Sequence, residues 1–336
     1  MKLTKWLIFI ILHYTQFVSS QAESINYIDY HKQISAIESF IIDSSHVKAI
    51  EPYKKLFSQY NFVFAEDCFR AVQTAVFIGD FKSAFHFLER GVEQGVKIER
   101  TLSDSLLINL KDQVYWRQFE DKYDSLRNLY LKKINKELRL KINELHCLDQ
   151  KHRDISQLQS WNFIRQYIID KKWRKITAKI VEEELIPLIK KYGFPGEKLI
   201  GVDEKGFEYK VTMDRVRTTF AQTILIHYFS VPRTAEFNKL LFSSIKTGHL
   251  SPSSYASIID FQAQWGKNKY YKGLHYNEWH SSKKPKELPV INKNRISIGL
   301  PSIKQHQREV ELARKAFFER KKGVYLNQVR FWHFRE

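Results

Sequence analysis

Apolar residues recur at steps of three and four positions along most of the chain, which is the spacing of one face of an α-helix. The first such stretch runs from Ile25 to Ile41 and ends at the polar sequence Asp43-Ser44-Ser45. Only 12 Gly and 8 Pro occur in 336 residues, while Phe, Tyr and Trp make up 14% of the chain. Helix breakers are therefore few and core material is plentiful. The pattern predicts a nearly all-α fold.

Small residues mark one specific pair of helices. A Gly-Asp turn at residues 79–80 separates two stretches with small or apolar side chains at four-residue steps, which are Ala71, Ala75, Ala84 and Leu88, with Gly91 following. This resembles one hairpin of a tetratricopeptide-like repeat. Residues 101–119 fit a degenerate neighbouring repeat. The alternative is a helical bundle that contains a single tight hairpin.

Two long helices are expected in the middle of the chain. Residues 122–153 contain no Gly or Pro, and their Leu, Ile and Tyr residues predict one long helix that joins an N-terminal to a C-terminal helical region. Residues 161–192 predict another, kinked at Pro187 and ended by the sequence Gly-Phe-Pro-Gly at 193–196. Its apolar positions include Phe163, Ile164, Tyr167, Ile168, Ile176 and Ile180.

Shorter elements follow toward the C-terminus. Residues 197–211 are expected to form a loop or a brief hairpin, and Pro285 and Pro289 indicate another loop. Ser251-Pro252 is typical of a helix N-cap followed by proline in the first turn. The remaining helices are predicted over 53–57, 215–229, 234–247, 251–264 and 302–322.

The N-terminal segment has the features of a cleavable secretory signal. Lys2 and Lys5 precede an apolar run over residues 6–12, and Val18-Ser19-Ser20 offers small side chains before Gln21. A membrane anchor would need roughly 18 or more apolar residues, and polar residues interrupt this run well before that length. We expect residues 1–20 to be a signal peptide and the mature chain to be exported, soluble and without a transmembrane segment.

Positive charge gathers at the C-terminal end. The chain carries 55 Lys and Arg against 37 Asp and Glu, and residues 280–336 alone hold 14 basic and 5 acidic residues. In the cytosol such a tail would indicate nucleic acid. Export favours an anionic envelope surface instead, and no nucleic-acid partner is expected. The alternative is that these charges lie on solvated helix faces.

The two cysteines allow two interpretations. Cys68 and Cys147 are the only cysteines of the chain, and an oxidising compartment would permit a disulfide between them. Both lie in apolar helical contexts, where a free cysteine behaves as a small core residue.

Common catalytic motifs do not occur in the sequence, and no cofactor is predicted. The chain contains no G-x-S-x-G, H-E-x-x-H, P-loop or G-x-G-x-x-G sequence. One polar motif stands at the end of the long helix over 122–153, where Asp149 and Arg153 share a helix face and Gln150 flanks them. Alone, such a motif is common on protein surfaces.

Further motifs follow in a fixed order. They are Gly193-Phe194-Pro195, His227 in an apolar helix, Asp260, Gly266-Lys267, Tyr270, and Arg295 four residues before Gly299-Leu300. With the Asp-Gln-x-x-Arg opening, this order over residues 122–305 resembles an uncharacterised bacterial family of α-helical domains, a domain of unknown function. The resemblance implies shared polar positions, namely Asp149, Gln150, Arg153, His227, Asp260 and Arg295, and it brings no established activity. Residues 270–274 depart from the family pattern.

His227 and a second group of polar residues are the candidates for chemistry. A histidine on an apolar helix is often a hydrogen-bonded core residue. The functional alternative makes His227 a general base that Asp149 or Asp260 orients, with Arg153 or Arg295 binding an anionic group. Separately, His275, Glu278 and His280 are weak candidates for metal ligands, because imidazole and carboxylate suit first-row metals. The alternative for that group is a polar loop.

These observations predict four segments and two functions. The segments are a signal peptide (1–20), a region of tetratricopeptide-like helical hairpins (21–120), a helical domain (121–305) and a basic amphipathic tail helix (306–336). The favoured function is that of an exported interaction or scaffold protein of the bacterial cell envelope, with a protein partner at the N-terminal hairpins and the tail on the envelope. The alternative is a hydrolase-like enzyme or small-ligand binder that uses the Asp, Arg and His residues.

Overall fold

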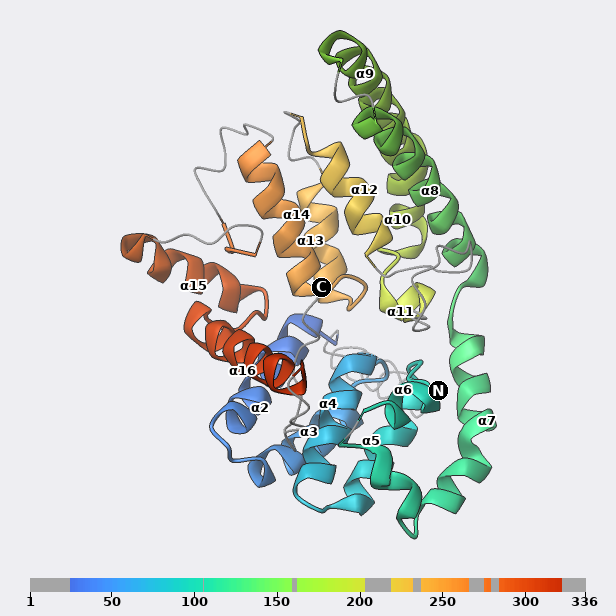
Figure 1. Cartoon of the computed structure of the whole chain (residues 1–336), viewed down its shortest axis with the longest axis vertical. Coiled ribbons are helices and arrows are strands. Elements are labelled where there is room, and N and C mark those ends of the chain that lie inside the picture. The colour runs from blue at the N-terminus through green and yellow to red at the C-terminus, as the bar shows by residue number, and fades with distance from the viewer. Residues whose placement is uncertain are drawn as a thin grey trace, which may run out of the picture.

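The computed structural model describes residues 25–104, 106–158, 162–202, 219–231, 237–265, 275–278 and 284–321 (Figure 1). Within these ranges every regular element is a helix and no strand occurs, which confirms the all-α prediction. No described helix is both long and apolar enough to span a bilayer. The expected signal peptide lies outside the described residues.

Helices α2 to α7 form one unit around an aromatic core, the blue to light-green part of Figure 1. Its helices are α2 (Tyr27–Ile42), α3 (Val47–Gln59), α4 (Ala65–Phe77), α5 (Phe81–Val92), α6 (Ile98–Leu102), the 3₁₀ turn η1 (Ile108–Asp112) and α7 (Trp116–Lys133). Tyr30, Tyr53 and Phe87 are fully buried in this core. Large aromatic side chains such as these dominate the burial energy of a small unit.

The hairpin expected around residues 79–80 is the α4–α5 pair. Gly79 adopts a φ of +77°, a conformation that side chains disfavour, and the Asp80 carboxylate caps α5 by accepting the Ser83 amide at 3.0 Å. Ala71 and Ala84 are completely buried, so the two helices pack closely. The described part of residues 101–119 contains only α6, η1 and the start of α7. The tetratricopeptide-like arrangement is not confirmed and remains a hypothesis.

The single long helix predicted over 122–153 is wrong, because the chain breaks between α7 and α8 (Lys136–Leu158). Ile134 is extended, and Asn135 caps α8 by accepting the amide of Leu138 at 2.9 Å. The amide of Asn135 itself donates to the carbonyl of Leu199 at 2.8 Å. Asn135 thus caps the second helix and separates it from the first, although the apolar spacing alone predicts one continuous helix.

The C-terminal helices enclose a second core, seen above the first in Figure 1. They are α8, α9 (Phe163–Lys179), the π-helical segment η2 (Ile180–Leu185), α10 (Ile186–Tyr192), α11 (Glu197–Ile200), α12 (Phe220–Tyr228), α13 (Asn238–Lys246), α14 (Pro252–Trp265), the 3₁₀ turn η3 (Pro285–Glu287), α15 (Leu288–Ser297) and α16 (Ile303–Lys321). Val181, Leu225 and Phe229 are completely buried there.

Proline positions explain several boundaries. Pro187 lies in the first turn of α10, directly after the π-helical segment, where wider backbone bonding accommodates its missing N–H group. The expected cap of α14 is confirmed, since the Ser251 hydroxyl accepts the Ser254 amide at 3.2 Å. The prediction of a loop at Pro285 and Pro289 is wrong. These prolines open η3 and α15, because the first turn of a helix tolerates proline.

The described part of the basic tail is docked on the N-terminal unit. Helix α16 contacts α2 (Figure 1). The Gln305 amide donates to the carbonyl of Ser35 at 2.8 Å, and Arg308 pairs with Asp43 at 2.8 Å. Glu309, one turn after Gln305, is almost fully buried. Residues 322–336 lie outside the described part of the chain.

The two cysteines are free, which excludes the disulfide in this structure. Cys68 is completely buried and is the small core residue that its context predicts. The same interpretation is wrong for Cys147, which is exposed on α8. Its neighbour Leu148 is also exposed, at 43%, so this part of α8 turns an apolar position toward solvent.

Candidate functional site

Three helices bring polar side chains together around Asp149. Helix α8 supplies Asp149, Gln150 and Arg153, α9 supplies Thr177, and α12 supplies His227. The spacing of 3.6 residues per turn puts positions 149, 150 and 153 on adjoining parts of one face of α8. Residues that are far apart in sequence therefore form one cluster, which we call the Asp149 cluster.

Asp149 is completely buried, and both of its carboxylate oxygens have partners within the cluster. Its Oδ1 accepts the Thr177 hydroxyl at 2.8 Å. Its Oδ2 accepts the Gln150 amide at 3.1 Å and lies 2.5 Å from Nδ1 of His227. A buried carboxylate is tolerated only with such partners. The arrangement fixes the position of the carboxylate and, through it, the orientation of the imidazole.

The Asp149 contact defines which nitrogen of His227 is available. With Nδ1 bonded to Asp149, Nε2 is the ring atom left for other chemistry. The indole of Trp173 packs edge-on against the imidazole at 5.4 Å between ring centroids. The His227 side chain keeps 12% of its surface exposed, whereas Asp149 keeps none. A histidine that a buried carboxylate orients and that keeps part of its surface exposed can accept and return a proton.

Arg153 extends the cluster by a further hydrogen bond. Its NH1 donates to the carbonyl oxygen of the Gln150 side chain at 3.2 Å, and the residue is half-buried. Gln150 therefore links the guanidinium to the carboxylate of Asp149 without a direct ion pair in the described contacts. The remaining donors of the planar guanidinium suit an anion that accepts two parallel hydrogen bonds, such as a carboxylate or a phosphate.

Asp260 and Arg295 belong to a different network. Asp260 on α14 is completely buried, and its carboxylate accepts the backbone amides of His275, Tyr276 and Glu278 at 2.7 to 2.9 Å. Arg295 on α15, also completely buried, donates to the Tyr276 carbonyl at 2.8 Å and to the Glu278 carboxylate at 2.5 Å. The two side chains hold the segment 275–278 against the helices. In this structure Asp149, not Asp260, contacts His227.

The metal candidates are only partly described. His280 lies outside the described residues. The Glu278 carboxylate accepts hydrogen bonds from Arg295 and from the Ser253 hydroxyl, the second at 3.2 Å. Among the residues that the structure describes, no group of three or more His, Cys, Asp or Glu side chains could hold a metal ion.

A buried charge network in the N-terminal unit was not expected from the sequence. Arg70 pairs with Glu38 at 2.5 Å and with Asp67 at 3.3 Å, and the Tyr30 hydroxyl donates to Asp67 at 2.7 Å. Burial raises the pKa of Glu38 to about 8 against the opposing effect of Arg70, and burial lowers the pKa of nearby His31 to about 3. No motif connects these residues, which lie on α2 and α4.

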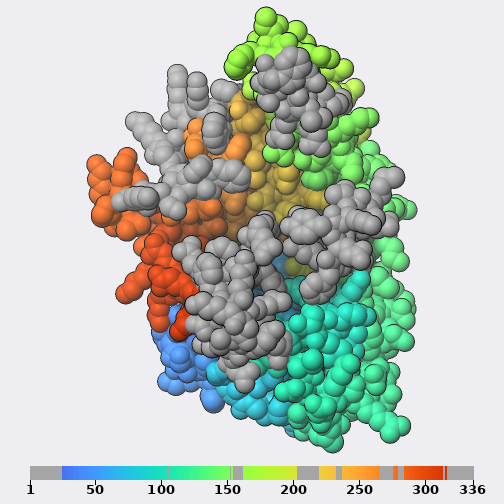
Figure 2. All heavy atoms as spheres, in the orientation of Figure 1, coloured from blue at the N-terminus to red at the C-terminus, as the bar shows by residue number. Residues whose placement is uncertain are grey.

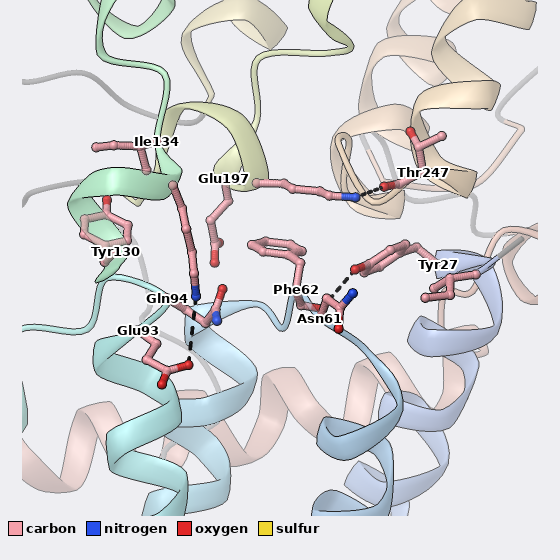
Figure 3. Close-up of a pocket in the computed structure, with 12 residues that line it drawn as sticks. Tyr27, Asn61, Phe62, Glu93, Gln94, Tyr130, Ile134, Glu197 and Thr247 are labelled. Carbon is pink, nitrogen blue, oxygen red and sulfur yellow. Dashed lines mark hydrogen bonds and ion pairs between the residues drawn. The ribbon is translucent and has the colours of Figure 1, made fainter. Parts of the chain in front are cut away.

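A cavity with a volume of about 510 Å³ lies between the two units. Tyr27, Phe62, Gln94 and Glu197 are among its lining residues (Figure 3). Glu197 ties the two units together, because its carboxylate accepts the Ala65 amide at the start of α4, at 2.6 Å. Lys198 donates to the Thr247 carbonyl at 2.7 Å within the C-terminal unit, and Lys133 lies 3.9 Å from Glu93 within the N-terminal unit. None of the six polar candidates from the sequence lines this cavity.

Comparison of the chain with protein-family models, with curated proteins and with solved structures finds no match in any of the three. Membership of the helical domain family therefore stays a prediction from the order of motifs. The features that bear on function are the chemistry of the Asp149 cluster and the molecular surface.

Proposed function

We propose that the chain is a hydrolase-like enzyme in which His227 is the general base. The observation that carries this proposal is the contact of 2.5 Å between Nδ1 of His227 and a completely buried Asp149 carboxylate that Thr177 and Gln150 also hold. A carboxylate in that place keeps the imidazole in one tautomer and stabilises the imidazolium that forms when Nε2 takes a proton.

In the proposed reaction a water molecule is the nucleophile. Nε2 of His227 removes a proton from the water as its oxygen attacks the electrophilic carbon or phosphorus of the substrate. The imidazolium then returns that proton to the leaving group, and the bond to the leaving group breaks. Arg153 binds an anionic group of the substrate through the donors that Gln150 does not use. The substrate class is thus a small ester, amide or phosphoester that carries a negative charge.

The test compares the full chain with three variants on a panel of anionic chromogenic esters, amides and phosphoesters. His227→Gln should lower kcat by about 100-fold or more, the range expected for loss of a general base. Asp149→Asn should lower kcat as well, and Arg153→Gln should mainly raise KM. An activity equal to that of the wild type in His227→Gln, with the variant folded, would contradict the proposal. So would the lack of any activity of the wild type on the whole panel.

An interaction protein of the cell envelope is the second candidate. The observation that favours it is the exposure of several apolar side chains between residues 108 and 115 of the N-terminal unit, where Ile108 is 53%, Val114 is 85% and Tyr115 is 37% exposed. Val47, elsewhere on this unit, is 71% exposed. We expect Val114→Ser to weaken capture of an envelope protein partner without changing the unfolding midpoint, as measured by pull-down and thermal unfolding. Unchanged capture by Val114→Ser and Val47→Ser would argue against a partner at this unit.

A further inference from the structure

The free end of the α8–α9 hairpin presents an apolar surface to solvent. Helix α9 projects beyond the neighbouring helices at the upper end of the molecule in Figures 1 and 2. Four large side chains in its first two turns are mostly exposed, namely Phe163 (84%), Ile164 (77%), Tyr167 (68%) and Ile168 (61%). Single exposed apolar residues are ordinary, but four adjoining ones mark an interaction surface. We call these four residues the α9 tip.

The exposed face of α9 changes from apolar to basic along its length. At 3.6 residues per turn, Lys171, Arg174 and Lys175 continue the stripe begun by the α9 tip, and all three are exposed. The opposite face carries Trp173 and Thr177, which contact His227 and Asp149. One side of the helix thus supports the Asp149 cluster, and the other is left for a partner.

The charge of α9 selects the kind of partner. Between Phe163 and Lys179 the helix has six Lys and Arg residues and one acid, Asp170. A second copy of the chain seated on this face would bring equal positive charge against it, which opposes self-association. An anionic lipid surface suits both parts of this face, because its negative headgroups attract the cations and its apolar interior accommodates the α9 tip.

A hollow for a headgroup lies where the apolar and basic parts meet. It has a volume of about 350 Å³, and its lining includes Tyr167, Lys171, Arg174, Lys175 and the carboxylate-bearing Asp170. Three cations around a small concave surface suit a phosphate group, and a tyrosine at this level is typical of side chains at a membrane interface.

We propose that α9 docks the protein on a membrane that contains anionic phospholipid, with the α9 tip inserted and Lys171, Arg174 and Lys175 at the phosphate layer. The helical rise of about 1.5 Å per residue puts Lys171 about 12 Å behind Phe163 along the axis. An inclination of the helix axis to the membrane normal reduces this separation to the depth of about 5 to 10 Å to which interfacial helices bury their apolar side chains. The proposal does not depend on the activity of His227.

The experiment is co-sedimentation of the full chain with vesicles of phosphatidylcholine alone and of phosphatidylcholine with about one third phosphatidylglycerol. One variant replaces the α9 tip by Phe163→Ser, Ile164→Ser, Tyr167→Ser and Ile168→Ser. A second carries Lys171→Gln, Arg174→Gln and Lys175→Gln. The matched control removes three exposed cations elsewhere, through Lys111→Gln, Lys132→Gln and Lys136→Gln. The apolar run at residues 6–12 is the same in every protein, so it cannot produce a difference between them.

We expect the wild type and the matched control to bind the mixed vesicles equally. The basic variant should partition about 100-fold less strongly, because each cation near the surface contributes about 1 kcal/mol. The tip variant should lose at least about tenfold in partitioning. Wild-type binding of the mixed vesicles should weaken with added salt, as screening requires.

Three results would overturn the proposal. The first is mixed-vesicle binding by the tip variant equal to that of the wild type, with both folded by circular dichroism. The second is loss of vesicle binding in a variant that carries Arg320→Gln, Lys321→Gln and Lys322→Gln, with binding retained in both α9 variants. That result would assign the membrane contact to the C-terminal tail. The third is failure of the wild type to bind the mixed vesicles, and an apparent dimer that the tip variant dissociates would then assign the α9 tip to self-association. Loss of vesicle binding with retained hydrolysis would separate this proposal from that of the enzyme.

Discussion

His227 and Asp149 lie 78 positions apart in the sequence, yet Nδ1 of the imidazole is 2.5 Å from Oδ2 of the carboxylate. Helices α12 and α8 carry them, and α9 closes the cluster through Thr177 and Trp173. The carboxylate is inaccessible to solvent, whereas the imidazole keeps part of its surface open. This difference in exposure is what an orienting carboxylate and a reacting base require.

Asp149 should contribute to stability as well as to chemistry. Asp149→Ala leaves the Thr177 hydroxyl and the Gln150 amide without their acceptor inside the protein. We expect the free energy of unfolding to fall by about 1 to 3 kcal/mol, the cost of unsatisfied buried polar groups. Urea unfolding of the variant measures this. Asp124→Ala, at an exposed position of α7, is the control and should change it by less than about 0.5 kcal/mol. Equal stability of the two variants would contradict the assigned hydrogen bonds.

Arg295 should be indispensable to the C-terminal core. Arg295→Met removes the donor to the Tyr276 carbonyl and leaves the Glu278 carboxylate without its partner. Loss of one member of a buried ion pair costs about 3 to 5 kcal/mol, and Arg295→Lys should not restore stability because lysine lacks the planar fork. Chemical denaturation checks both variants against Lys293→Met, an exposed position on the same helix. A stable Arg295→Met variant would show that the segment 275–278 is held in another way.

Asn135 should determine the break between α7 and α8. Asn135→Ala removes the side-chain acceptor of the Leu138 amide, and loss of such a cap costs about 1 kcal/mol. The control is Asn128→Ala, at an exposed position within α7, where alanine is the better helix former. Thermal unfolding should thus show a decrease for the first variant only. A rise in stability for Asn135→Ala would mean that the sequence favours a continuous helix after all.

Stability should fall as the pH rises from about 6.5 to about 8. Burial raises the pKa of Glu38 from its ordinary value of 4.5 to about 8. Between these values the folded chain holds a proton that the unfolded chain has lost, so each increase in pH lowers the free energy of unfolding. His31 has the opposite effect, because burial lowers its pKa from 6.5 to about 3 and the unfolded chain binds the extra proton between those values. Above pH 6.5 His31 no longer contributes, and the effect of Glu38 remains.

The variant that isolates this effect is Glu38→Gln. It keeps the size of the side chain beside Arg70 and cannot lose a proton. Asp67, Glu66 and Glu309 are the other acids near Glu38, and they stay in place. Unfolding midpoints measured between pH 6.5 and 8 should decline in the wild type and decline less in the variant. Parallel curves would assign the pH dependence to other groups.

Apolar spacing predicted most helices of this fold and failed where a polar residue determines a helix boundary. It located α2, the α4–α5 hairpin and the α13–α14 region, since these helices bury the residues that repeat at three and four steps. It missed the break at Asn135 because a capping asparagine differs little from one within a helix. It also could not say which apolar residues of α9 and of the adjoining η2 are buried. Phe163 and Ile180 fit the same pattern, but the first is 84% exposed and the second is in the core.

The sequence placed the candidate residues without their contacts. It named Asp149 and Asp260 as alternatives for orienting His227, and only the packing of α8 against α12 distinguishes them. Thr177 and Trp173 could not be found, because a threonine and a tryptophan on an amphipathic helix carry no motif. The same holds for Glu38 and Arg70, whose pairing depends on how α2 crosses α4.

The most direct test of the central claim is the ratio of hydrolysis rates of wild type and His227→Gln at neutral pH, on the best substrate of the anionic panel. The account predicts a ratio of about 100 or more, because His227 supplies the base. The unfolding midpoint of the variant should stay near that of the wild type, since glutamine can still donate to Asp149. A ratio near one, with both proteins folded, would contradict the account and make the Asp149 cluster a structural network only.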